Sequence, residues 1–142
     1  MKFLEGKRTY FFPNPNKDWS WSIKTKEGQK SQHLGEIALK ENCESGHLIL
    51  DWQFEEKFFR GLRKRLKERP EKNTFVEDAI QTMVDFCKEN GAMKLSMQAP
   101  VDSKNKHQVL EKLGFKRTSL TFGLELGVDD ASTSNELYRL GK

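Results

Sequence analysis

Carboxylates on predicted strands are the residues of this sequence best suited to acid–base chemistry. Glu36 and Asp51 each lie in a run of residues that predicts a strand, and a strand carboxylate can take a proton from a bound substrate. By alternation, Asp51 shares a strand face with His47, Ile49 and Gln53, so a His47–Asp51 pair is a second arrangement. All of these positions also fit a solvent-facing strand, and the sequence leaves the choice open.

Positive charge is concentrated between residues 55 and 72. These 18 residues hold eight basic and four acidic side chains, whereas the other 124 hold 17 of each, so the segment carries the whole net charge of +4. The segment suits the phosphates of a nucleotide, nucleic-acid phosphates or an acidic protein, and it also suits a merely solvated face. The candidate anion-binding side chains are Arg60, Arg63, Lys64 and Lys67.

Composition and cysteine usage disfavour several other classes of protein. Ten Phe and three Trp argue for a packed core rather than disorder. Cys43 and Cys87 do not form a disulfide framework and fit a reducing, cytoplasmic compartment. The three histidines are scattered, so no metal site is predicted. There is no apolar run near the ~20 residues of a membrane span and no signal-peptide pattern, so no membrane partner is expected.

Hydrophobic periodicity places the candidate carboxylates on an antiparallel set of strands. Alternating residues and turn residues predict strands over 7–12, 19–24, 35–40 and 47–54. A stripe of Phe58, Leu62 and Leu66 then predicts a helix over 55–69 that ends before Pro70, with the basic residues on its other side.

The remaining elements alternate between helix and strand. Thr74 and Glu77 form a capping-box sequence, so a helix is predicted from there to Asn90–Gly91. A strand over 94–99, a helix over 104–113 and a strand over 116–126 with a bend at Gly123 follow. We therefore predict one α/β domain over 1–127 with a mixed sheet, and a tail over 128–142.

The stretch from Asp85 to Phe115 (DFCKENGAMKLSMQAPVDSKNKHQVLEKLGF) resembles the C-terminal half of the GNAT acyl-CoA N-acyltransferase fold. The resemblance implies GNAT-like topology: largely antiparallel N-terminal strands, then helix, strand, helix and strand. It also implies acyl-CoA as the cofactor and an amine as the acceptor.

The resemblance places the phosphates of acyl-CoA at the N-terminus of the helix that begins after Thr74. Counting back from Gly91, Glu71, Thr74 and Val76 stand at the family's leading Gln/Arg position and its two glycine positions, so both glycines are absent. Counting back from Gly114, Leu110 stands where the family often has a proton-donating Tyr. The implied cofactor-binding residues are Lys72, Thr74, Phe75, Val76 and Ser103.

Two functions remain open from the sequence. The first is a divergent N-acyltransferase, in which Glu36 or Asp51 assists proton removal from the amine. The second is a catalytically inactive GNAT-like module that binds a nucleic acid or an acidic protein through the basic helix over 55–69. Whether the protein is an enzyme is left undecided at this stage.

Overall fold

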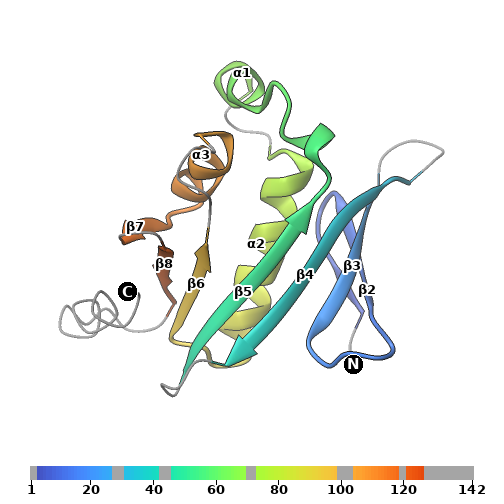
Figure 1. Ribbon diagram of the computed structural model, residues 1–142, viewed down its shortest axis with the longest axis vertical. Coiled ribbons are helices and arrows are strands. Elements are labelled where there is room, and N and C mark those ends of the chain that lie inside the picture. The colour runs from blue at the N-terminus through green and yellow to red at the C-terminus, as the bar shows by residue number, and fades with distance from the viewer. Residues whose placement is uncertain are drawn as a thin grey trace.

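The computed structural model describes residues 3–26, 31–41, 46–69, 73–98, 104–118 and 121–126. Within these ranges the chain folds into a mixed sheet with helices packed on it (Figure 1). The elements are β1 (Leu4–Glu5), β2 (Thr9–Pro13), β3 (Ser20–Thr25), β4 (His33–Glu41), β5 (His47–Phe54), a 3-10 turn (Glu56–Phe58), α1 (Leu62–Glu68), α2 (Phe75–Glu89), β6 (Lys94–Gln98), α3 (Lys104–Lys112), β7 (Lys116–Thr118) and β8 (Thr121–Glu125).

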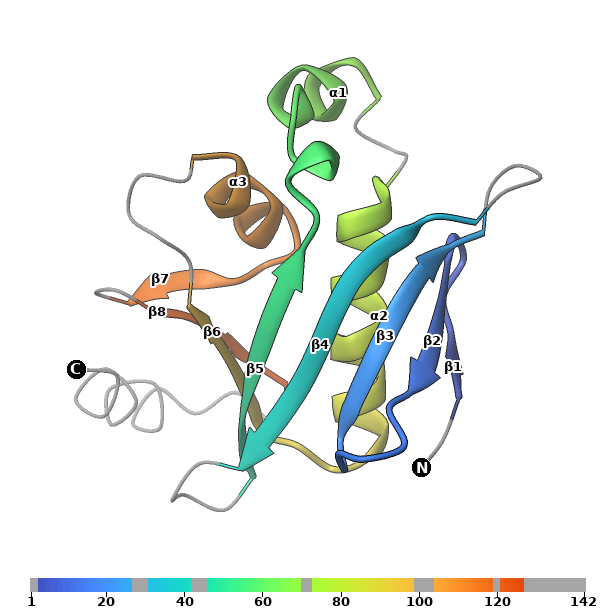
Figure 2. The same ribbon diagram turned by 45° about the vertical axis from the view of Figure 1, so that its right-hand side comes forward.

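The sheet confirms the predicted α/β fold class. Its strand order is β1-β2-β3-β4-β5-β6-β8-β7, and within the described residues every pairing is antiparallel except that of β5 with β6. A parallel pair needs a crossover, and the chain between β5 and β6 supplies it through α1 and α2. The β5 and β6 strands diverge toward their C-terminal ends (Figures 1 and 2).

The core lies between α2 and one face of the sheet. The predicted apolar face of α2 is buried, and it packs in one cluster with residues such as Phe11, Trp21 and Ile37. The helix begins as predicted: Thr74 Oγ1 accepts from the Glu77 amide at 3.2 Å, and Glu77 Oε1 accepts from the Thr74 amide at 3.0 Å. It ends at Gly91, which has a φ of 80°.

The predicted continuous helix over 55–69 is wrong. The segment forms a 3-10 turn, breaks, and restarts as α1 at Leu62. Gly61 lies at the break with a φ of 65°, a conformation that costs glycine little. The Phe59 ring is buried, and its carbonyl accepts from Asn105 Nδ2 at 2.9 Å rather than continuing a helix. Tertiary contacts of Phe59 therefore override the regular apolar spacing.

The single strand predicted over 116–126 is also wrong, because the structure has a hairpin there. Strand β7 pairs with β8, and β8 pairs in turn with β6. Gly123 lies inside β8, where an added Cβ would come within 3.0 Å of the Lys94 side chain. The tail over 128–142 and the residues Cys43, Lys72 and Ser103 lie outside the described ranges.

No helix in the part of the chain that the structure describes is long and apolar enough to cross a membrane.

Candidate functional site

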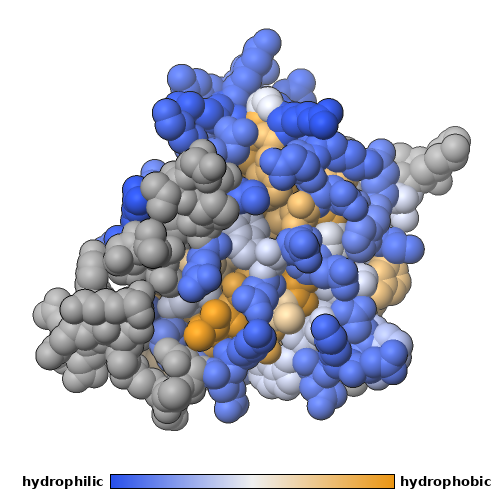
Figure 3. Space-filling view, in the orientation of Figure 1, coloured by the Kyte–Doolittle hydropathy of each residue, from blue (hydrophilic) through white to orange (hydrophobic). Residues whose placement is uncertain are grey.

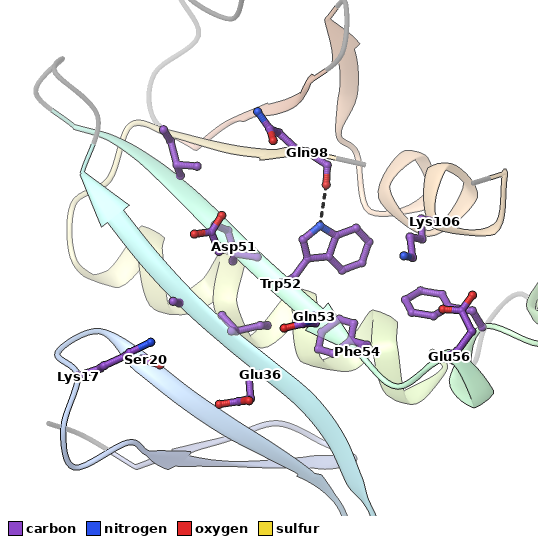
Figure 4. Close-up of a pocket in the computed structure, with 15 residues that line it drawn as sticks. Lys17, Ser20, Glu36, Asp51, Trp52, Gln53, Phe54, Glu56, Gln98 and Lys106 are labelled. Carbon is purple, nitrogen blue, oxygen red and sulfur yellow. Dashed lines mark hydrogen bonds between the residues drawn. The ribbon is translucent and has the colours of Figure 1, made fainter. Parts of the chain in front are cut away.

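A cavity lies where β5 and β6 separate. Their ladder pairs residues 47–50 with residues 94–97, and β5 continues for four residues beyond it. A cavity of about 980 Å³ opens at this point (Figure 4). Ligands of α/β sheets characteristically bind beyond the carboxyl ends of parallel strands. We call this cavity the cleft; its lining includes Lys17, Glu36, Ile49, Asp51, Trp52, Gln53, Phe54, Glu56, Phe59, Gln98 and Lys106.

Both carboxylates that the sequence singled out line the cleft. Glu36 on β4 pairs with Gln53 on β5, and Asp51 pairs with Ala38, so the two acids are diagonal neighbours on adjacent strands. Both side chains are exposed and lie on the sheet face opposite α2 (Figure 4). Asp51 forms an ion pair with Lys40 at 3.0 Å. The cleft therefore carries negative charge that can attract a protonated amine.

His47 and Asp51 do not pair with one another. They are four strand residues apart, roughly 13 Å. His47 Nε2 lies 2.7 Å from Ser96 Oγ in a buried contact. Burial, together with the nearby Lys94 ammonium, lowers the pKa of His47 to about 4, so the imidazole is neutral at pH 7. His47 therefore belongs to a buried polar cluster at the opposite end of β5 from the cleft.

Trp52 lies across the opening between β5 and β6. Its half-buried indole donates from Nε1 to the Gln98 carbonyl at 2.8 Å, which joins the two strands beyond their last ladder pair (Figure 4). The rings of Phe54 and Phe59 lie 5.5 and 6.1 Å away, both at steep angles. Strand alternation places Trp52 on the same face of β5 as Leu48, Leu50 and Phe54, and the gap that it spans depends on where the two strands separate.

A second cavity, of about 680 Å³, lies at the N-terminus of α2. The implied cofactor residues Thr74, Phe75 and Val76 line it. Arg8, from the turn between β1 and β2, stacks over the Phe75 ring at 4.1 Å and donates to the Asn73 carbonyl at 2.7 Å. We call it the basic cavity; its other lining residues are Lys7, Phe58, Arg65, Glu68, Arg69 and Asp78.

The four predicted patch residues are not the ones that reach this cavity. Arg60, Arg63, Lys64 and Lys67 are exposed on and beside α1, which forms a hydrophilic top to the molecule (Figure 3), and none of them lines either cavity. Arg65 and Arg69, which the sequence did not distinguish, line it instead. The break at Gly61 sets which side of α1 faces the cavity, so a continuous helical stripe could not identify them.

Two other sequence positions have structural roles. Leu110, at the family's Tyr position, is fully buried in the core and offers no proton. Cys87 is fully buried in the core, and this burial raises the pKa of its thiol to about 12. Among the described residues, no group of three or more His, Cys, Asp or Glu side chains is arranged to hold a metal ion.

No family model and no curated protein matches the sequence. Solved structures do match the fold. A GNAT-family acetyltransferase from Bacillus anthracis has 12% identity and a TM-score of 0.65 over 88% of this chain and 99% of that chain. The N-terminal domain of a ribosomal-protein-alanine acetyltransferase from Clostridium acetobutylicum has 16% identity and a TM-score of 0.62 over 87% and 95%. An acetyltransferase from Agrobacterium tumefaciens has 12% identity and a TM-score of 0.61 over 88% and 95%. At sequence identities this low, structural similarity shows the fold alone. The fold of this chain is that of the GNAT acetyltransferases.

Proposed function

We propose that the protein is a divergent acyl-CoA-dependent N-acyltransferase and that the cleft is where the amine acceptor binds. One observation carries the proposal: the cavity at the carboxyl ends of the parallel pair contains both Glu36 and Asp51. A carboxylate attracts the ammonium form of the acceptor and can take its proton, which leaves a neutral amine that can attack an acyl carbon.

The ionisable side chains that line the cleft are Glu36, Asp51 and Glu56, together with Lys17 and Lys106. Leu110 is buried where the family often has Tyr, so a proton for the leaving thiolate would come from water or another cleft residue. Lys106 of α3 also lines the cleft, with Nζ 5.0 Å from the centre of the Phe59 ring. Its charge would favour a developing thiolate or oxyanion.

The basic cavity supports acyl-CoA as the cofactor, through charge rather than through a glycine loop. The capping box already engages the amides of Thr74 and Glu77, so these two are not open to a phosphate. Four basic side chains line the cavity against two acids, and one of these acids, Asp78, already accepts three hydrogen bonds from residues 7–9. Arg8, Arg65 and Arg69 would therefore hold the phosphates. Bound acyl-CoA would supply the activated acyl group.

The linings of the two cavities include consecutive residues at the end of the 3-10 turn. Phe58 lines the basic cavity, and its neighbour Phe59 lines the cleft. A ligand with phosphates at one end and a reactive group at the other matches this layout.

Calorimetry with coenzyme A tests the cofactor assignment. The double variant Arg65→Ala/Arg69→Ala should weaken binding at least about tenfold, because each of the two substitutions removes a charge-assisted contact with a phosphate. The matched control Arg60→Ala/Arg63→Ala removes the same charge from the same segment outside the cavity, and it should change the Kd less than about threefold. No binding by the wild-type protein would reject acyl-CoA, and equal losses in both doubles would reject the basic cavity.

Acetyl transfer to small amines tests the cleft. Glu36→Gln and Asp51→Asn should each lower kcat/KM, by about 10²–10⁴-fold for the residue that acts as the base. Glu41→Gln, on the same strand but outside the cleft lining, is the control. If neither cleft variant slows transfer more than the control does, the carboxylates are not the base.

The exposed basic face of α1 favours a second candidate function, an inactive GNAT-fold module that binds a nucleic acid or an acidic protein. Lys64 there has only a weak ion pair with Glu68 at 3.9 Å, so its charge is available to an anionic partner. Charge reversal at Arg60, Arg63 and Lys64 should abolish binding of single-stranded or duplex nucleic acid, measured at two salt concentrations. Unchanged binding would reject this surface.

A further inference from the structure

The cleft has lining residues from both faces of the sheet, and it lies where β5 and β6 separate. Asp51 and Gln53 lie on the exposed face, whereas Trp52 and Phe54 alternate with them toward the core side. Phe59, which follows the end of β5, also lines the cavity. A ligand that bound its phosphates near α2 and crossed the sheet where β5 and β6 separate would bring its reactive end toward Glu36, so the residue at this place would affect its entry.

The Trp52 indole lies where β5 and β6 separate. The side chain extends from β5, and its indole donates a hydrogen bond to the carbonyl of Gln98, the last residue of β6 (Figure 4). The ladder between the strands stops at the pair Leu50–Met97, and the indole forms a polar link between the strands beyond this point. The bond crosses the opening from side to side.

The contacts of Trp52 are those of a side chain that can leave its position. The indole is only half-buried, whereas the core residue Trp21 is fully buried. Its polar contact is one hydrogen bond between neutral groups, and the neighbouring Phe54 and Phe59 rings meet it edge-on. The adjacent cavity of about 980 Å³ gives the ring space to move into.

We infer that Trp52 is a displaceable plug that closes the passage between β5 and β6 until an acyl-thioester ligand enters. The inference rests on the proposed function for the identity of the ligand. In a protein whose binding-competent state is only partly populated, the apparent affinity is reduced by that fraction. Trp52 therefore lowers the affinity for the ligand, in contrast to a residue that merely forms the wall of a binding site.

The test compares coenzyme A binding by Trp52→Phe, Trp52→Ala and the wild-type protein. Trp52→Phe keeps an aromatic ring but loses the Nε1 donor, and it should bind about fivefold tighter, the equivalent of one neutral hydrogen bond. Trp52→Ala should bind tighter still. Trp19→Phe, an exposed tryptophan outside the cleft lining, is the control and should leave the Kd unchanged. Thermal unfolding checks that each variant folds.

A second readout follows the ring itself. With 5-fluorotryptophan incorporated, the fluorine resonance of Trp52 should shift when coenzyme A binds, and that of buried Trp21 should not. A wild-type protein that binds coenzyme A while both Trp52 variants bind equally or more weakly overturns the plug and leaves the proposed function intact. Absence of binding in all three proteins overturns both.

Discussion

Asp78 should be one of the most destabilising positions to substitute, because it connects α2 to the N-terminal strands. Its carboxylate lies on the first turn of α2 and is only 4% exposed. It accepts hydrogen bonds from the amides of Lys7 and Arg8 at 3.2 and 2.9 Å, and from Thr9 Oγ1 at 2.7 Å. The turn approaches so closely that a Cβ on Gly6 would lie 2.4 Å from Asp78 Oδ2. Asp78 thus fixes the turn from which Arg8 reaches the basic cavity.

The size of the effect follows from these three bonds. Each hydrogen bond to a charged group contributes about 1.5–3 kcal/mol, and water can replace part of the loss at the two partly buried amides. Asp78→Ala should therefore lower the free energy of unfolding by about 3–5 kcal/mol. Asp78→Asn keeps the side-chain size but turns one acceptor oxygen into a donor, so it should lower it by about 2–3 kcal/mol.

Urea unfolding of the two variants measures this effect, with Asp85→Asn as the control. Asp85 is an exposed acid on the same helix, and its carboxylate accepts a hydrogen bond from the Gln81 side chain at 3.0 Å. Its substitution should change the free energy of unfolding by less than about 0.5 kcal/mol. A loss below about 1 kcal/mol for Asp78→Ala, or an equal loss for the control, would refute the role given to Asp78.

Two further predictions concern protonation and backbone strain. The pKa of His47 falls from an ordinary 6.5 to about 4 on folding, so between these pH values the unfolded chain binds more protons. Stability should therefore fall as the pH drops from 6.5 toward 4, by about 2 kcal/mol at pH 5. Urea unfolding at pH 7 and pH 5 should show this loss. In His47→Gln, most of this difference in stability between pH 7 and pH 5 should be absent. Gly61→Ala should lower the free energy of unfolding by about 1–2 kcal/mol through its positive φ alone, since no atom lies within 4 Å of the added Cβ; no loss in thermal unfolding would show that the break at Gly61 relaxes freely.

Local patterns predicted much of this fold because local chemistry determined it. The capping box of Thr74 and Glu77, the buried face of α2 and the alternation of β5 depend on residues close in sequence, and all appear in the structure. The break before α1, in contrast, does not depend only on residues close in sequence. The apolar spacing continues through Gly61, and only the contact between Asn105 and Phe59, 46 residues apart, shows that the helix is interrupted.

The candidate site divides in the same way. Glu36 and Asp51 share a face because of strand alternation and the hairpin pairing of β4 with β5, and both relations can be read from sequence. The position of Trp52 in the gap requires the residue at which β5 separates from β6, which is a long-range property. The choice of Arg65 and Arg69 over Arg60 and Arg63 requires the orientation of α1, which follows the break at Gly61.

The way α2 begins explains why side chains would have to bind phosphate in this protein. A glycine loop leaves helix amides open to an anion, whereas here the capping box engages two of these amides internally. The compensating charge comes from two distant segments: Arg8 beside β2, and Arg65 and Arg69 at α1. A bound phosphate would therefore tie the N-terminal strands and α1 to the start of α2. Under the proposed function, coenzyme A affinity depends on the hydrogen bonds by which Asp78 holds residues 7–9. Asp78→Ala should therefore weaken coenzyme A binding as well as stability. Charge alone predicts the opposite, because Asp78 and the phosphates are both negative.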